Sequence, residues 1–217
     1  MDKQQIIDII KKEKIVAIVR GVPKDKILML ADALMKGGIH CMEITLDQNS
    51  QDGYKNTLES ISMLCEAYKE KLLVGVGTAM TAEQVTLAAK AGAKYVISPN
   101  VCREVIEKTN ELGLVSMPGA FTPTEIADAY KMGGDLIKVF PISNIGAGYL
   151  KAVSAPLSHI PLLAVGGVQP EDIKSYTAAG AVGFGVGGNL VNKKWINEGR
   201  FDLLTQEAKR YRDAVES

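Results

Sequence analysis

The chain has 217 residues, of which 47% are hydrophobic and 23% charged, with 25 basic residues balancing 25 acidic ones. This composition excludes a disordered chain and suits one folded domain over residues 1–217. The zero net charge gives no electrostatic reason to expect nucleic acid or an anionic membrane as a partner.

The N-terminal stretch "MDKQQIIDIIKKEK" is charged and amphipathic, so we expect an N-terminal helix and not a signal peptide. No apolar run in the sequence reaches the length of a transmembrane helix. The cysteines Cys41, Cys65 and Cys102 are widely spaced and form no metal-knuckle pattern. A reduced, cytoplasmic location is therefore the simplest expectation.

Short apolar runs then alternate with amphipathic stretches. "KIVAIVRG" predicts a strand, and the helix that follows it over 24–38 ends at Gly37-Gly38. "CMEITL" precedes a helix over 53–71, and "LLVGVGT" precedes the helix "TAEQVTLAAKAG", which opens with a threonine cap. The strands "YVISPN", "VSMPG", "LIKVFP", "PLLAVGG" and "AVGFGVG" follow, with helices over 102–113, 123–134, 146–155, 170–180 and 201–215.

Near-continuous apolar strands that alternate with helices predict a parallel sheet covered on both faces. Eight strand–helix pairs after an N-terminal helix, in a chain this short, predict a (β/α)8 TIM barrel. A doubly wound open sheet is the alternative. The first strand–helix turn, "RGVPKD", lacks the glycine fingerprint of a dinucleotide site, and we expect no cofactor.

In such barrels the active site lies at the C-terminal ends of the strands. Glycine pairs end the last two predicted strands, where barrels commonly bind phosphate through backbone N–H groups. The unusual residues of the strands gather at the same end: Arg20, Glu43, Thr45, Thr78, Ser98, Pro99, Asn100, Pro118, Gly119, Lys138, Gly166, Gly167, Gly187 and Gly188.

Lys138 stands in the middle of the apolar strand "LIKVFP". Because side chains alternate along a strand, Lys138 shares a face with Leu136 and Phe140, and both Lys138 and Glu43 are predicted to point into the barrel. Burial lowers the pKa of a lysine, and the neutral amine can attack a ketone to form a Schiff base. A carboxylate such as Glu43 can then move protons. With a phosphate seat, these groups predict a carbon–carbon lyase acting on a phosphorylated keto compound.

Each of these residues also has a structural alternative. Lys138 and Glu43 could form a buried ion pair without catalytic purpose. Arg20 could be a solvated charge at a strand end, and Thr78 could cap the following helix. The glycine pairs could be turn residues only.

The stretches "IVAIVRG", "MEITL", "VGVGTAMT", "VISPN", "MPGAFTPTE", "IKVFP", "AVGGV" and "GVGGNLV", in this order and spacing, resemble the 2-keto-3-deoxy-6-phosphogluconate aldolases. Members of this family often also cleave 4-hydroxy-2-oxoglutarate. The resemblance runs from about residue 10 to residue 192. It implies a class I aldolase on a (β/α)8 barrel that is usually trimeric and metal-free.

The resemblance also implies residue roles. Lys138 would be the Schiff-base lysine and Glu43 the general acid/base. Thr78 and Pro99 would lie beside the bound pyruvate moiety, with Phe140 also in the substrate site. The two glycine pairs, Gly166-Gly167 and Gly187-Gly188, would hold the phosphate.

Three positions depart from the family pattern. Asp47 stands where many members have an arginine, so Arg20 is expected to supply that cation. Val165 replaces a threonine before the first glycine pair, and Gly188 replaces a serine in the last phosphate turn. "AVGGV" together with "RG" also resembles the 6-phosphogalactonate branch of the family, whose substrates differ only at C4.

The leading hypothesis is therefore cleavage of 2-keto-3-deoxy-6-phosphogluconate to pyruvate and glyceraldehyde 3-phosphate, with cleavage of 4-hydroxy-2-oxoglutarate to pyruvate and glyoxylate as a second reaction. We expect a homotrimer without a metal. The alternatives are a 2-keto-3-deoxy-6-phosphogalactonate aldolase, a sugar-phosphate epimerase or synthase that uses Glu43 without lysine chemistry, and a non-catalytic sugar-phosphate-binding barrel.

Overall fold

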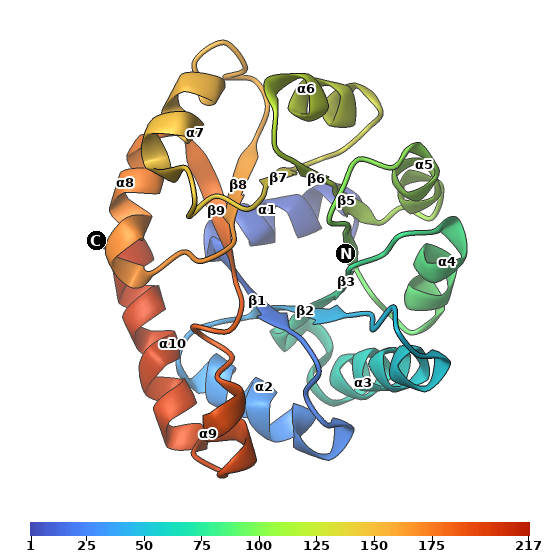
Figure 1. Ribbon diagram of the computed structural model, residues 1–217. Coiled ribbons are helices and arrows are strands. Elements are labelled where there is room, and N and C mark those ends of the chain that lie inside the picture. Colours follow the sequence, from blue (N-terminus) through green and yellow to red (C-terminus); the bar gives the residue numbers. More distant parts are fainter.

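The computed structural model spans residues 1–217 and describes every side chain except those of Gln51 and Asp52. Strands surround a central axis and helices form an outer ring (Figure 1). The strands are β1 (Ile15–Val19), β2 (Cys41–Thr45), β3 (Leu73–Gly77), β4 (Tyr95–Ile97), β5 (Val115–Met117), β6 (Gly119–Ala120), β7 (Ile137–Val139), β8 (Leu162–Val165) and β9 (Ala181–Val186).

The helices, except the short one over 193–197, begin and end close to the predicted positions. They are α1 (Lys3–Glu13), α2 (Ile27–Lys36), α3 (Gln51–Tyr68), α4 (Ala82–Lys90), α5 (Arg103–Glu111), α6 (Pro123–Lys131), α7 (Gly146–Ser154), α8 (Ile173–Ala178), α9 (Lys193–Asn197) and α10 (Phe201–Glu216). Short 3-10 turns occupy Lys24–Lys26, Lys69–Lys71 and Pro170–Asp172. None of the described helices combines the length and apolar character that a membrane span needs.

The nine strands form one parallel sheet in the order β5-β4-β3-β2-β1-β9-β8-β7-β6. β5 pairs with β4 and β6 pairs with β7, and only Pro118 separates β5 from β6 along the chain. A proline has no N–H for a sheet ladder, so it splits one barrel strand into two short segments. With β5 and β6 counted as one strand, the sheet closes into the predicted (β/α)8 barrel, and the open-sheet alternative is wrong.

Capping explains several helix starts. The Thr81 side chain accepts a hydrogen bond from the Gln84 N–H at the start of α4, which confirms the predicted threonine cap. Asp2 makes the equivalent capping box at α1. The short helix α9 was not predicted.

Alternating residues of each strand belong to two separate apolar layers. Ile137, Val139 and Met42 pack in the outer layer, between the sheet and the helices. Leu136 and Cys41 belong to the inner layer, inside the barrel. Three isoleucines of α1, Ile6, Ile7 and Ile10, join this inner layer, so α1 closes the N-terminal end of the barrel (Figure 1). The active site is therefore expected at the other end, where the strands have their C-termini.

Candidate active site

Glu43 and Lys138 project into the barrel from β2 and β7, which are four strands apart in either direction around the closed sheet. Glu43 is 1% exposed and Lys138 is 8% exposed. Their neighbours of the same parity, Cys41 and Leu136, lie in the inner apolar layer. The predicted inward orientation of both side chains is therefore confirmed, and their catalytic roles stay predictions.

The barrel interior shifts the pKa of both side chains toward neutral pH. Burial lowers the pKa of Lys138, which the charge of Glu43 opposes and that of Arg20 assists. Burial raises the pKa of Glu43, which Lys138 and Arg20 oppose. A lysine with a lowered pKa has more of its amine in the neutral, nucleophilic form.

The two groups do not form the structural ion pair considered above. Among the described residues, Lys138 has no carboxylate oxygen within the 4.0 Å of an ion pair, and Glu43 Oε2 has no hydrogen-bond partner. The carboxyl group and the amine face the same interior without being bonded to each other. An unpaired carboxyl group and an unpaired amine are therefore available as an acid/base group and a nucleophile.

Gly77 makes the position of Glu43 possible. A Cβ atom at Gly77 would lie 1.6 Å from Glu43 Oε1 and 2.5 Å from Glu43 Cγ. Every residue other than glycine at this position of β3 would therefore displace the carboxylate.

Phe140 and the first glycine pair form one wall beside Lys138. Lys138 Nζ lies 4.7 Å from the centroid of the Phe140 ring, which is 39% exposed at the barrel mouth. A Cβ atom at Gly166 would lie 3.1 Å from that ring. Gly166 and Gly167 have φ values of +99° and +76°, which favour glycine. Val165 is buried in the inner layer.

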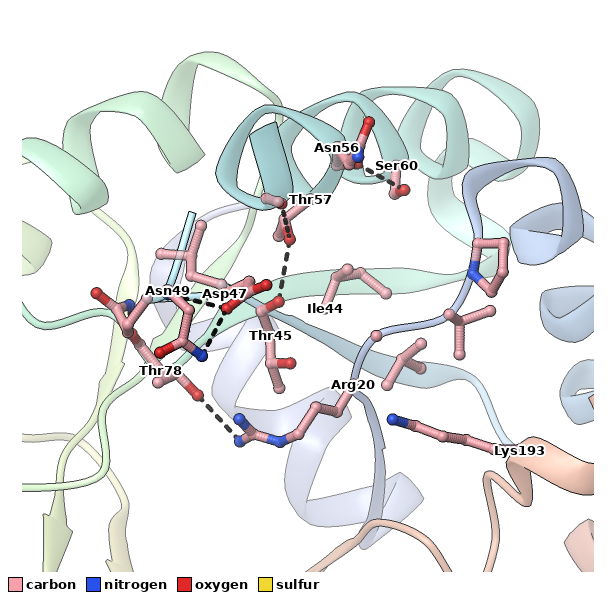
Figure 2. Close-up of a pocket in the computed structure, with 17 residues that line it drawn as sticks. Arg20, Ile44, Thr45, Asp47, Asn49, Asn56, Thr57, Ser60, Thr78 and Lys193 are labelled. Carbon is pink, nitrogen blue, oxygen red and sulfur yellow. Dashed lines mark hydrogen bonds between the residues drawn. The ribbon is translucent and has the colours of Figure 1, made fainter. Parts of the chain in front are cut away.

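Arg20 reaches toward Thr78. Arg20 Nη2 donates a hydrogen bond to Thr78 Oγ1 over 3.2 Å (Figure 2). Thr78 has a left-handed φ of +58°, which is uncommon for a threonine. Gln48 Nε2 donates to the Thr78 carbonyl over 2.7 Å, and Gln84 Nε2 donates to Gln48 Oε1 over 2.8 Å. Because Thr81 caps α4, the alternative role of Thr78 as that cap is wrong.

A cavity of about 550 Å³ opens at the barrel mouth beside these residues (Figure 2). Its lining includes Arg20, Thr45, Thr78, Asp47 and Lys193. Glu43 and Lys138 do not line it. Most of its lining comes from the loops after β1 and β2 and from α3 (Figure 2).

Lys193, from α9, is a cation that the sequence interpretation did not include. Together with Arg20 it also lines a smaller cavity of about 400 Å³ beside Gly187 and Gly188. A Cβ atom at Gly21, next to Arg20, would lie 3.3 Å from Lys193 Nζ. Among the described residues, no carboxylate lies within ion-pair distance of either cation. Two unpaired positive charges therefore flank the second glycine pair.

The two glycine pairs adjoin, as expected from neighbouring strands. Asn189 Nδ2, just after Gly187-Gly188, donates to the carbonyl of Val168, just after Gly166-Gly167, over 3.4 Å. Pro99 lies at the rim, and its backbone packs against Gly119, the strand partner of Lys138. No group of three or more His, Cys, Asp or Glu side chains in the described part of the chain could hold a metal ion.

Known proteins resemble this chain over most of its length. The family model for "KDPG and KHG aldolase" matches residues 6–207. The 2-dehydro-3-deoxy-6-phosphogalactonate aldolase of Escherichia coli (strain K12) is 34% identical over 94% of this chain and 98% of its own. The 2-dehydro-3-deoxy-phosphogluconate aldolase of Haemophilus influenzae is 30% identical over 98% of this chain and 97% of its own. The solved "Native KDPGal structure" superposes with a TM-score of 0.83 at 33% identity, covering 94% of this chain and 96% of that chain.

Proposed function

Because this chain belongs to the KDPG and KHG aldolase family, and is therefore a carbon–carbon lyase, we propose that it cleaves a phosphorylated 2-keto-3-deoxy sugar acid through a Schiff base on Lys138. The observation that carries the proposal is the placement of Lys138 in the apolar interior, where burial lowers its pKa, with Glu43 facing the same interior. No other lysine belongs to the buried part of the described chain.

The reaction is assigned to these groups as follows. Neutral Lys138 Nζ attacks the C2 ketone, and loss of water gives a protonated imine. Glu43 removes the proton of the C4 hydroxyl, the C3–C4 bond breaks, and the aldehyde leaves while the imine accepts the electron pair as an enamine. Protonation of C3 and return of the water molecule release pyruvate and free Lys138.

The charged ends of the substrate are assigned to two different sets of groups. The phosphate is assigned to the backbone of Gly166-Gly167 and Gly187-Gly188, with Lys193 as its cation. Arg20 and Thr78 are assigned to the carboxylate of the pyruvate half, since Arg20 bonds to Thr78 across the mouth. The sequence interpretation gave Arg20 the role of a cation in the phosphate mouth, and this assignment gives that role to Lys193.

We propose that both C4 epimers are substrates, the 6-phosphogluconate-derived and the 6-phosphogalactonate-derived keto acid. Support comes from Val165, which has no hydroxyl that could bond to a C4 hydroxyl of one configuration. An apolar wall leaves no buried polar group unpaired with the other epimer and discriminates weakly. The test compares kcat/KM for the two epimers in the parent and in Val165→Thr. A preference of more than about 10⁴-fold in the parent would contradict relaxed specificity.

Trapping with pyruvate and borohydride tests the covalent step. The parent is expected to gain a reduced adduct that peptide mapping places on Lys138, and Lys138→Met is expected to lose both the adduct and cleavage. Lys90→Met, which removes an exposed lysine at the end of α4, is the control. An adduct on another lysine contradicts the assignment. Cleavage without an adduct, lost with a chelator and restored by magnesium or manganese, would favour the metal-dependent alternative.

We further propose a homotrimer in a reducing, cytoplasmic setting. The cysteines Cys41, Cys65 and Cys102 are free thiols, which fits that setting. Exposed apolar side chains near the mouth, Phe121 stacked on Tyr149 and the nearby Ile145, offer surface for subunit contact. Analytical ultracentrifugation tests the subunit count, and a monomer at micromolar concentration would contradict it.

A further inference from the structure

Tyr95 lies inside the barrel next to Glu43. The inward positions of β3 are Leu73, Gly75 and Gly77, and the two glycines carry no side chain. A Cβ atom at Gly75 would lie 2.2 Å from the Tyr95 ring, so this ring, which comes from β4, crosses β3 over Gly75. The Cα partner of Gly75 on β2 is Glu43. The Tyr95 ring therefore points toward the base of the Glu43 side chain, one layer below its carboxyl group.

These two residues share an unusual property. Among the described side chains, the buried oxygen or nitrogen atoms without a hydrogen-bond partner are Glu43 Oε2 and the Tyr95 hydroxyl. Tyr95 is fully buried. Buried polar atoms in proteins are nearly always hydrogen-bonded, and each exception calls for an explanation. One water molecule between two such oxygens on adjoining residues can satisfy both.

We propose that Tyr95 is a positioning residue for Glu43, and that its hydroxyl donates a hydrogen bond to a bound water molecule that in turn donates to Oε2. The bond holds the carboxyl group over Gly77 with Oε1 turned toward the substrate side. It also stabilises the charged form of Glu43. The role of this contact in catalysis rests on the proposed function, whereas the existence of the contact does not depend on it.

The groups that face Glu43 come from four strands. Lys138 on β7 and Arg20 after β1 are cations that favour its charged form. Cys41, on the same face of β2, keeps its thiol proton because burial raises its pKa. Tyr95 on β4 likewise keeps its proton, since burial and the neighbouring Cys41 and Glu43 raise its pKa.

Tyr95→Phe tests the inference because it removes one oxygen atom and keeps the ring that fills the space over Gly75. The readout is the titration of the Glu43 side-chain carboxyl by ¹³C NMR, with the signal assigned by its loss in Glu43→Gln. Removing a donor to the charged form is expected to raise the apparent pKa of Glu43 by about one unit. The limb of the kcat pH profile that Glu43 controls is expected to move to higher pH by the same amount.

Tyr68→Phe is the matched control, since its hydroxyl bonds to the Leu28 carbonyl and to Asp32 on the outside of the barrel. It is expected to leave the Glu43 titration unchanged. An unchanged titration in Tyr95→Phe would overturn the inference. Because NMR titration needs no turnover, a parent protein without aldolase activity would count against the proposed function and leave this comparison intact.

Discussion

At the scale of single residues, the site depends on the absence of a side chain at Gly77. Gly77 leaves the space that the Glu43 carboxyl group fills, 1.6 Å from where a Cβ atom would stand. Gly77→Ala is therefore expected to expel the carboxylate and to lower kcat by about 10²–10⁴-fold, the usual contribution of a general acid/base. Steady-state kinetics measures the loss. Gly148→Ala, where a Cβ atom would meet nothing within 4 Å, is the control, and near-normal kcat in Gly77→Ala would show that Glu43 acts from another position.

Glu43 itself gives a second prediction at this scale. Glu43→Gln keeps the shape of the side chain and removes the titrating group. We expect kcat to fall by about 10²–10⁴-fold while borohydride still traps pyruvate on Lys138, because the nucleophile is unchanged. Mass spectrometry of the trapped adduct separates the two effects. A variant that turns over at the parental rate at its pH optimum would exclude Glu43 as the proton carrier.

Single residues also mark the limit of what the sequence could predict. Strand alternation was enough to orient Glu43 and Lys138, because it depends on neighbouring residues of one strand. The need for glycine at position 77 depends on a contact with a residue of another strand, which alternation cannot reveal. Arg20 was expected beside the last strand, and it does line the cavity at Gly187 and Gly188, but its bond to Thr78, which follows β3, was not predicted.

At the scale of elements, the short helix α9 brings Lys193 to the second glycine pair. Lys193→Ala is expected to raise KM for phosphorylated keto acids about 10- to 100-fold, as the loss of a charge-assisted hydrogen bond would. 4-Hydroxy-2-oxoglutarate, the second substrate that the family resemblance predicts, has no phosphate, so its kcat/KM is expected not to change. Kinetics with both substrates tests this, with Lys90→Ala as the control. An equal loss with both substrates would place Lys193 elsewhere in the reaction.

The elements themselves were predictable to different degrees. Barrel strands are buried on both faces, so each one appears as an apolar run between turn residues. The helix α9 has five residues, fewer than two turns, and cannot show a helical repeat of apolar positions. Lys193 was missed with it, although two lysines soon after a glycine pair are a signal that could have been followed.

At the scale of the whole molecule, the two ends of the barrel have different tasks. The inner apolar layer and the isoleucines of α1 fill the N-terminal end. The charged and polar residues gather at the other end, around cavities of about 550 and 400 Å³. Stability and chemistry are thereby separated along one axis, with Glu43 and Lys138 at the boundary between the two regions.

The closure of one end by α1 makes the barrel a well with a single opening. A molecule whose ketone reaches Lys138 occupies the bottom, and the half that carries the phosphate lies above it, nearer the exit. After cleavage the aldehyde phosphate must leave before pyruvate can, because it lies nearer the opening. Release of the two products is therefore ordered, with pyruvate last. Pyruvate should therefore inhibit cleavage competitively with the substrate, and the aldehyde phosphate noncompetitively. Product-inhibition kinetics checks this order, and the reverse pattern would mean that pyruvate has another way out.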